Sequence, residues 1–411
     1  MSSLDIELPF GADGRWACSV AAERVLLYHR APQALKLLTQ RVRERLTSPL
    51  DFPALSQAVL PDDRIVIALD QQTPGAASLI RGCWDVLDSV GVDPQSILIL
   101  QPGSAADATA LDPRCELPES VAEQIQLTRH DAQDTKNLAY LASTTSGERI
   151  YLARELIDAD FVLCAGAIAY DPLLGYRGTS SVLYPGLSSD DAIRKSRGQG
   201  HDELGPDDVR GLRQTIDEVG WLLGVQFALQ VVPAGRRGVA DVITGSCDAA
   251  FRRGKQQLAE HWGIELDERP ETVVVAVDAV DKQDVWPALG AALESARRLV
   301  ARDGRIVVLS QACAPLSPGL ELIRASRTPR DALQPLRLAV PHDVAASTQI
   351  AKTADWARVY LFSGVEEALV EDLFMTPLSN VAEYRRLLDS GGTVAFVESA
   401  QFSSVQRLVP V

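Results

Sequence analysis

Residues 64–70, which read RIVIALD, decide the fold class of this chain. The run of apolar residues inside this stretch has no alternating polar positions, which predicts a strand buried on both faces, as in a parallel sheet. A helical pattern follows from about Pro74 to Val90, and Gly91 is placed to end that helix. A buried strand followed by a covering helix predicts an α/β protein with mainly parallel sheets.

The same alternation of strand and helix continues along the chain, with one interruption. Residues 263–271 are polar and unpatterned, so we expect two α/β domains, residues 1–264 and residues 271–411. Residues 311–350 carry five of the 23 prolines and are expected to be rich in loops. The predicted strands are 96–100, 161–164, 225–232, 239–243, 272–277, 305–309, 359–362 and 393–397. The predicted helices are 188–197, 206–222, 248–262, 285–301, 365–372 and 379–389.

Composition excludes several classes of function. The net charge of −15 opposes binding to nucleic acid and to anionic membrane surfaces. No apolar run approaches the length of a membrane span, and the acidic start of the sequence is unlike a secretory signal. The six cysteines are scattered singly, which is typical of reduced thiols in the cytoplasm. We therefore expect a cytoplasmic protein that acts on a small molecule, with an oligomeric state that the sequence does not give.

The loop of residues 175–181, GYRGTSS, is a candidate for binding an anion. It follows a predicted strand and combines backbone N–H groups and three hydroxyls with the guanidinium of Arg177, and Ser180 and Ser181 are its last residues. It is not a Walker A loop, because no lysine follows the second glycine. An equally simple interpretation is a glycine-rich connection whose polar groups are satisfied by its own hydroxyls.

The end of the first buried strand is a second candidate site. Residues just beyond the carboxyl ends of parallel strands face the ligand in open α/β sheets, which favours Asp70 and Gln71 as ligand contacts. Thr73 extends the same tip, but it could instead cap a helix that begins at Pro74. Both roles are compatible.

No metal site is predicted from spacing alone. The five histidines are isolated from one another, and none has a second histidine at the spacing of metal ligands. There is also no G-x-G-x-x-G after the first strand and no G-x-S-x-G. These absences argue against a dinucleotide site and against a serine hydrolase.

Taken in order, these segments resemble the nickel-dependent lactate racemase family over roughly residues 20–400. Residues 46–50 (LTSPL) are similar to the family's L-x-x-P segment, and residues 67–74 (IALDQQTP) are similar to a strand ending in D-D-x-T-R-P. Residues 166–186 resemble G-x-I-x-x-H-x-x-x-G-x-x-G-G-x-K-x-x-x-P-G, and residues 245–254 resemble a later G-D-x-x-x-A-H-x-x-G. The order and spacing of these matches carry the resemblance.

The resemblance implies two α/β domains with the site in the cleft between them. It also implies racemisation or epimerisation of 2-hydroxy acids on a nickel-pincer nucleotide, which takes a hydride from the substrate carbon and returns it. In this family a lysine holds the cofactor, a histidine ligates nickel, two histidines act as bases and an arginine binds the substrate carboxylate.

This sequence departs from the family at each of those positions. The matched positions hold Ala105 and Asp171 for the two bases, Ser181 for the lysine, Arg197 for the nickel ligand and Pro74 for the arginine. His201 lies four residues beyond Arg197 and is the one histidine near enough to restore a metal ligand. Phe251, Trp286 and Gly290 replace a further histidine, a tyrosine and a lysine. We therefore predict no nickel-pincer cofactor in this chain.

Two functions stay open at this point. The first is a binding or regulatory protein, a former enzyme that takes a small hydroxy-acid-like anion with Arg177, Arg197, Ser180 and Ser181 as donors. The second is a repurposed or still active isomerase, racemase or epimerase of a 2-hydroxy or sugar acid. In that case Asp171 or Asp70 would be the base and Arg197 would hold the anion. We expect Asp171 and Arg197 to face the same cleft between the domains.

Overall fold

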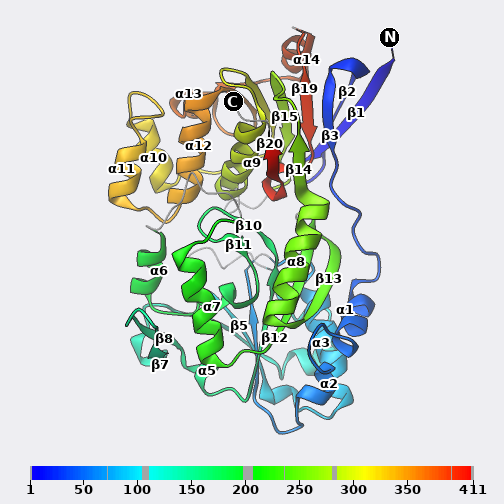
Figure 1. The fold of residues 1–411 in the computed structure, drawn as a ribbon, viewed down its shortest axis with the longest axis vertical. Coiled ribbons are helices and arrows are strands. Elements are labelled where there is room, and N and C mark those ends of the chain that lie inside the picture. The colour runs from blue at the N-terminus through cyan, green and yellow to red at the C-terminus, as the bar shows by residue number, and fades with distance from the viewer. Residues whose placement is uncertain are drawn as a thin grey trace. The chain divides into compact units, whose positions relative to one another are not determined.

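Contacts between residues divide the chain into two units, which we name the central unit and the terminal unit. The central unit is Gln33–Leu258, and the terminal unit combines Met1–Pro32 with Ala259–Val411. The computed structural model describes residues 2–71, 73–103, 111–197, 207–235, 237–279, 285–389 and 391–408. The two units are shown in Figure 1 and are described here one at a time.

The central unit is built on a six-stranded sheet in the order β13-β12-β9-β4-β5-β6. All neighbouring strands pair in parallel except β12 and β13, which form an antiparallel pair. The strands are β4 (Ile65–Leu69), β5 (Ile97–Gln101), β6 (Gln126–Arg129), β9 (Phe161–Ala167), β12 (Phe227–Ala234) and β13 (Gly238–Ser246). A mainly parallel α/β sheet was the fold class predicted from residues 64–70, and it is confirmed.

The apolar run of β4 is explained by burial on both faces of this sheet. Ile65, Ile67 and Leu69 belong to one core with helices α1 (Leu38–Thr47), α2 (Leu55–Ala58) and α3 (Ala76–Ser89). Val66 and Ala68 belong to a second core with α5 (Arg154–Ile157) and α7 (Gly211–Leu223). Because successive side chains of a strand point to opposite faces, a strand covered on both sides has no position left for a polar residue.

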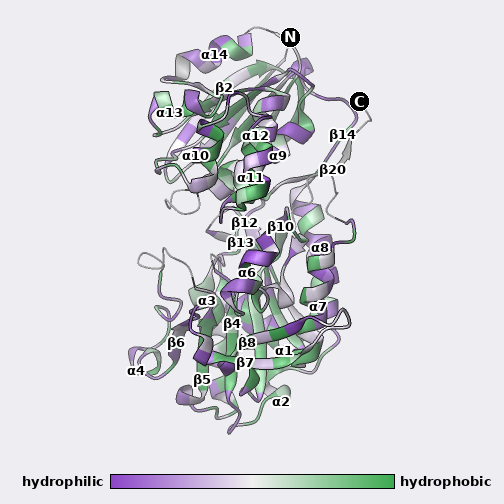
Figure 2. Cartoon of the chain, turned by 90° about the vertical axis from the view of Figure 1, so that its left-hand side faces the viewer, coloured by the Kyte–Doolittle hydropathy of each residue, from purple (hydrophilic) through white to green (hydrophobic). Residues whose placement is uncertain are grey.

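The remaining elements of the central unit are short strand pairs and helices. They are α4 (Glu119–Ala122), β7 (Leu138–Ser143) with β8 (Arg149–Ala153), β10 (Ala169–Asp171) with β11 (Gly175–Arg177), and α6 (Asp190–Arg197). Helix α8 (Cys247–Trp262) leads out of the central unit. Figure 2 shows that α6 is largely hydrophilic, in contrast to the hydrophobic strands of the sheet.

The terminal unit has a second six-stranded sheet, in the order β18-β17-β16-β15-β19-β3, and every pair in it is parallel. The strands are β3 (Val25–His29), β15 (Thr272–Ala276), β16 (Arg305–Leu309), β17 (Arg358–Phe362), β18 (Thr376–Pro377) and β19 (Val394–Val397). Helices α9 (Val285–Leu299), α10 (Pro318–Arg324), α11 (Leu333–Ala339) and α12 (Val344–Trp356) contribute to the core on one face. The antiparallel hairpin of β1 (Ser3–Phe10) and β2 (Gly14–Ala21) packs with α14 (Val381–Asp389) on the other face. The remaining elements are α13 (Glu367–Asp372) and the parallel pair of β14 (Gly263–Leu266) and β20 (Ser404–Leu408).

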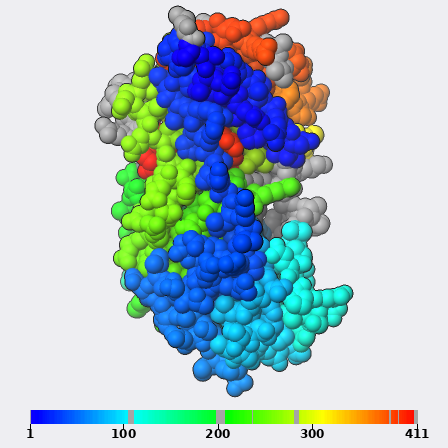
Figure 3. All heavy atoms as spheres, turned by 90° about the vertical axis from the view of Figure 1, so that its right-hand side faces the viewer, coloured from blue at the N-terminus to red at the C-terminus, as the bar shows by residue number. Residues whose placement is uncertain are grey.

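The first 32 residues belong to the terminal unit, whereas the prediction placed them in a first domain of residues 1–264. Strand β3 pairs with β19 near the other end of the chain, and Figure 3 shows the N-terminal residues in dark blue beside C-terminal residues in orange. Pairing between strands so far apart in sequence leaves no trace in local periodicity. The predicted end of the first domain, by contrast, lies close to the change of unit at Leu258.

Two local predictions are wrong. Residues 311–350 are not mainly loop, because they contain α10, α11 and α12. Pro318 is the first residue of α10. At that position a backbone N–H makes no hydrogen bond within the helix, so proline is tolerated. The helix after Asp70 begins at Ala76 rather than at Pro74, and its N-cap is Gly75 in the left-handed conformation (φ 68°). Thr73 therefore does not cap this helix.

Within the described residues, no helix is both long enough and apolar enough to cross a membrane.

Candidate functional site

Asp70 occupies a restricted position at the carboxyl end of β4. Its backbone N–H donates to the carbonyl of Ala165 in the neighbouring strand β9 at 2.8 Å. The next residue of β9 is Gly166, and a Cβ there would lie 2.9 Å from the Cβ of Asp70. Glycine at position 166 therefore provides the space that the Asp70 side chain fills.

The Asp70 side chain is partly buried, and its pKa is shifted. Burial raises the pKa of Asp70, and the negative charge of Asp171 adds to the rise. The guanidinium of Arg177 and a hydrogen bond from the Gln71 backbone oppose it. The structure thus brings Asp70, Asp171 and Arg177, three residues singled out from the sequence, into one electrostatic cluster.

Arg177 is the cation of this cluster. It ends the short strand β11, where it pairs with Ala169 of β10. Its Nε atom is buried and has no hydrogen-bond partner in the part of the chain that the structure describes. A buried donor without an acceptor is unfavourable, typically by about 1–3 kcal/mol or more for a charged group. An acceptor supplied by a bound anion would remove that cost.

Asp171 has a structural task in addition to its charge. Its Oδ1 accepts hydrogen bonds from the backbone N–H groups of Leu173 and Leu174, at 2.8 and 2.9 Å. These two bonds close the turn between β10 and β11. The same carboxylate therefore shapes the loop that carries Arg177.

Three backbone N–H groups of residues 178–181 donate hydrogen bonds within the protein. The Gly178 N–H donates to Oγ of Ser181 at 2.8 Å, and the Thr179 N–H donates to Oε1 of Gln230 at 3.0 Å. The Ser181 N–H donates to the carbonyl of Gly178. Of these three amides, only the Gly178 N–H meets a hydroxyl of the loop itself. Among the described residues, Arg177 is the donor of this loop that has a buried atom without a partner.

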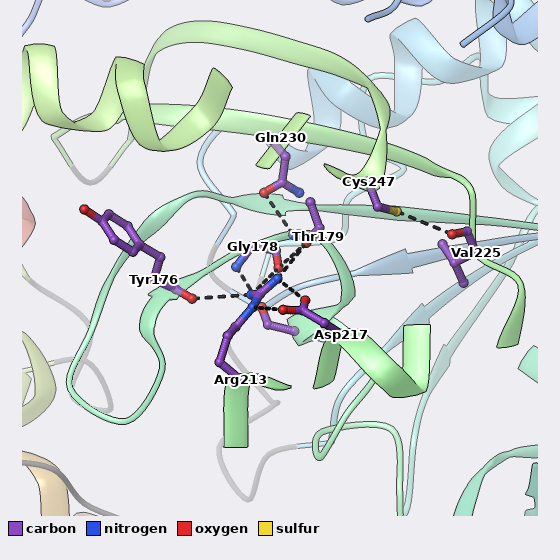
Figure 4. Close-up of polar contacts among 9 residues, drawn as sticks. Tyr176, Gly178, Thr179, Arg213, Asp217, Val225, Gln230 and Cys247 are labelled. Carbon is purple, nitrogen blue, oxygen red and sulfur yellow. Dashed lines mark hydrogen bonds and ion pairs between the residues drawn. The ribbon is translucent and has the colours of Figure 1, made fainter. Parts of the chain in front are cut away.

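Arg213 of α7 holds the same loop from the other side (Figure 4). Its Nη1 donates to the carbonyls of Tyr176 and Gly178, and its Nη2 donates to Oγ1 of Thr179 at 3.2 Å. Asp217, one helical turn on, accepts two bonds from the same guanidinium. Sequence reasoning missed this pair, although an arginine and an aspartate spaced i,i+4 in a predicted helix were a usable signal.

Phe251, which the resemblance places at the position of a histidine, contacts Arg213. The guanidinium carbon of Arg213 lies 4.0 Å from the centre of the Phe251 ring. A cation over an aromatic face is stabilised by the ring electrons. The Phe251 side chain therefore supports the loop through Arg213.

Lys255 of α8 approaches the loop as well. Its ammonium lies 4.4 Å from the centre of the Tyr176 ring and forms an ion pair with Asp207. Among the described residues, Lys255 is the lysine that lies against β11. Its ammonium already contacts the Tyr176 ring and the Asp207 carboxylate.

Ser180 lies beside the partly buried thiol of Cys247. Burial raises the pKa of Cys247 to about 11, while the Ser180 hydroxyl and the charge of Arg213 act in the opposite direction. The thiol itself donates to the carbonyl of Val225 at 3.6 Å. A thiol with this pKa stays protonated near neutral pH and is a poor nucleophile.

The other predicted tip residues stabilise the end of β4. Gln71 donates from Nε2 to the carbonyl of Pro102 at 2.6 Å, which ties the tips after β4 and β5 together. Thr73 is buried and donates from Oγ1 to the carbonyl of Asp70 at 2.7 Å. These two hydrogen bonds stabilise the backbone around Asp70.

The remaining predicted positions are spread more widely. Arg197 is the last residue of α6, and no hydrogen bond or ion pair joins it to Asp171 among the described residues. That both face a cleft between the units stays a prediction. Ala105 and His201 lie outside the described residues.

The histidines and acids of the described ranges do not assemble into a metal centre. No group of three or more His, Cys, Asp or Glu side chains suited to a metal ion occurs there. His130 is buried, and its Nε2 is hydrogen bonded to the carbonyl of Ser188 at 2.7 Å. This contact gives that imidazole a structural role.

Comparison with known proteins identifies relatives along almost the whole chain. Residues 13–201 match the family model "Lactate racemase N-terminal domain". The lactate racemase of Thermoanaerobacterium thermosaccharolyticum is 18% identical over 409 residues, which covers 94% of each chain.

Solved structures agree with the fold. The lactate racemase apoprotein of the same organism has a TM-score of 0.79 at 16% identity, and the match covers 98% of this chain and all of that chain. A crystal structure of a Thermotoga maritima protein has a TM-score of 0.66 at 12% identity and covers 92% of this chain. The two α/β units, the ordered motifs and the domain match lead to one conclusion: residues 13–201 match the lactate racemase N-terminal domain, and the whole chain is lactate-racemase-like in fold and sequence.

Proposed function

We propose that this protein binds a small hydroxy-acid-like anion at Arg177 and does not racemise it on a nickel-pincer nucleotide. The observation that carries the proposal is the buried Nε of Arg177, which has no acceptor in the described structure although the charge of Arg177 acts on Asp70. A guanidinium matches the two oxygens of a carboxylate, and it is more weakly hydrated than an ammonium.

Asp70 would regulate this site by its protonation. An ionised Asp70 competes with an incoming anion for Arg177, whereas a protonated Asp70 does not. Because burial raises the pKa of Asp70, the protonated form persists to higher pH than for an exposed aspartate. The hydroxyl of a hydroxy acid could then donate to this carboxylate or accept from the carboxylic acid.

The residues present do not fit the cofactor of the relatives. The position of the anchoring lysine holds Ser181, and its Oγ is occupied in closing the turn with the Gly178 N–H. Lys255 contacts Tyr176 and Asp207 instead, and Phe251 packs on Arg213. The proposed function therefore involves no reaction on the nickel-pincer nucleotide.

The proposal is tested by calorimetry and thermal shift of the full chain with L-lactate, D-lactate and D-gluconate. We expect at least one of these anions to bind and to be recovered unchanged. Arg177→Gln should abolish the binding, whereas Arg194→Gln, on the exposed face of α6, should not change it. Failure of all three anions to bind, or equal binding by Arg177→Gln, would contradict an anion site at Arg177.

A second candidate function is an isomerase, racemase or epimerase of a 2-hydroxy or sugar acid. A buried carboxyl with a raised pKa beside a guanidinium is an arrangement that can serve a general base and its anionic substrate. Asp171→Asn is an informative variant, because the amide oxygen can still accept from Leu173 and Leu174. Loss of turnover in this variant would favour the enzyme, and stoichiometric nickel in the purified protein would overturn our rejection of the pincer cofactor.

We also propose a cytoplasmic location. All six cysteines are free, and Cys83 and Cys164 are buried. Free thiols are typical of proteins kept in a reducing compartment.

A further inference from the structure

The terminal unit contains a pocket that is separate from the residues considered so far. It has a volume of about 500 Å³ and lies between the β1–β2 hairpin, the ends of β16 and β17, and α14. Small-molecule sites commonly have volumes of about 300–1,000 Å³. Its lining includes Phe10, Trp16, Gln311, Phe362, Ser363 and Tyr384.

The pocket lies where α/β sheets commonly bind ligands. Leu309 and Phe362 are the last residues of β16 and β17, they pair in register, and both line the pocket. The residues that follow, Ser310 and Ser363, line it too. Ligands of open parallel sheets bind beyond the carboxyl ends of the strands.

The walls of the pocket are aromatic. The rings of Phe10 and Phe362 meet edge to face with centroids 5.9 Å apart, and those of Phe362 and Tyr384 lie 5.7 Å apart. Trp16 is 6.0 Å from Tyr384. Such a set of rings offers faces and edges to another flat ring.

Two donors in this wall have no hydrogen-bond partner among the residues that the structure describes. Trp16 and Tyr384 are 3% and 2% exposed, and in the described residues neither the indole Nε1 nor the phenol Oη has a hydrogen-bond partner. An indole N–H can only donate. Burial raises the pKa of Tyr384, so the phenol keeps its proton and is available as a donor. Both residues line the pocket, but each donor atom is itself covered by protein, so a ligand with acceptor atoms reaches these donors when the ring side chains shift.

The other polar groups of the lining are already engaged. Gln311 accepts from the Ala12 N–H at 2.7 Å and donates to Asp13 at 2.8 Å, which fixes the hairpin tip. Ser363 accepts from the Val365 N–H. Arg15, the charged residue of the described lining, is 77% exposed in its side chain and is paired with Glu7. A polyhydroxylated or strongly charged ligand would find few partners here.

We infer that this pocket binds an uncharged planar heteroaromatic ring with acceptor atoms, of the nucleobase type, between the aromatic side chains of Phe10, Trp16, Phe362 and Tyr384. The ring would be held by aromatic contacts and would accept from the indole of Trp16 and the phenol of Tyr384. This site is independent of Arg177 and of the proposed anion.

The test is calorimetry of the full chain with adenosine and with nicotinamide, with ribose as the probe that lacks the ring. We expect binding of at least one heteroaromatic probe at millimolar concentration or below, and none of ribose. Tyr384→Phe keeps the ring and removes the hydroxyl, and Trp16→Phe keeps an aromatic ring, though a smaller one, and removes the indole N–H; each should weaken binding by about tenfold. Trp221→Phe and Tyr151→Phe, which make the same changes at exposed positions, should have no effect.

Two further variants keep the test decisive. Ser363→Phe places a ring in the pocket and should abolish binding even if a donor variant folds poorly. Arg177→Gln should bind the heteroaromatic probe like the wild type, which separates this inference from the proposed anion site. Absence of binding by both probes, binding of ribose alone, or unchanged binding by Trp16→Phe and Tyr384→Phe would each overturn it.

Discussion

Gly166 and Asp70 fit together across neighbouring strands, because a Cβ at residue 166 would lie only 2.9 Å from the Cβ of Asp70. The neighbour that would be displaced is the base of a side chain, which moves only with its backbone. The pair therefore fixes where the Asp70 carboxyl group lies relative to Arg177, and it makes the geometry of the proposed anion site sensitive to a single methyl group.

Gly166→Ala should destabilise the protein by about 1–3 kcal/mol through overpacking and should weaken any anion binding that depends on Arg177. Urea denaturation and calorimetry measure the two effects. Gly211→Ala is the matched control, because no atom lies within 4 Å of a Cβ there and alanine favours a helix. Equal stability of both variants would show that β9 can move away from Asp70.

The stability of Asp70→Asn relative to the wild type should rise with pH. In the wild type the folded state holds the Asp70 proton more tightly than the unfolded state does, since its pKa is raised above 3.8. Unfolding therefore releases a proton in the window between these two pKa values, and the wild type loses stability as pH increases through it. The variant lacks this loss. Urea denaturation of both proteins from pH about 4 to about 8 tests the sign, and a constant difference would contradict a raised pKa.

Arg213→Gln should lower the free energy of unfolding by about 2–4 kcal/mol, because it leaves two carbonyls and a hydroxyl of the buried loop without their donor. Asp217→Asn should cost only about 0–1 kcal/mol, since the Asp217 side chain is 54% exposed. Chemical denaturation of the single and double variants measures both and their coupling. A larger effect from Asp217 than from Arg213 would show that the ion pair, rather than the loop contacts, is what stabilises this region.

Ser181→Ala should destabilise the protein by about 1 kcal/mol, because the Gly178 N–H loses its acceptor. Ser181→Thr keeps the hydroxyl and should retain most of the stability. Thermal and urea unfolding of the two variants provide the comparison. If Ala and Thr behave alike, the hydroxyl has no structural role, and Ser181 is free for a ligand.

Tyr384→Phe should leave stability unchanged or raise it by up to about 1 kcal/mol, because the hydroxyl that it removes is buried without a partner in the described structure. Tyr184→Phe is the contrasting variant, since the Tyr184 hydroxyl is hydrogen bonded to Glu148 and Ser196. It should cost about 1 kcal/mol. Destabilisation by Tyr384→Phe would mean that this phenol has a partner in the folded protein.

Local patterns predicted most of the central strands because burial on both faces leaves an uninterrupted apolar run, as at Ile65 to Leu69. The helices that contain Pro318 and Pro335 escaped prediction, since proline is compatible with the first turn of a helix as well as with a loop. The N-terminal hairpin was also missed, although residues 3–10 alternate between exposed and buried positions in the way an amphipathic strand does.

The sequence by itself determined the α/β class and the resemblance to lactate racemases, since these depend on local periodicity and residue identity. Only the tertiary structure placed Asp70, Asp171 and Arg177 in one cluster, brought Arg213 and Gln230 to the same loop, and joined β3 to β19. It alone revealed the unpartnered donors of Trp16 and Tyr384. Burial, pKa and hydrogen-bond satisfaction depend on neighbours from distant parts of the chain, and those neighbours are chosen by packing rather than by local pattern.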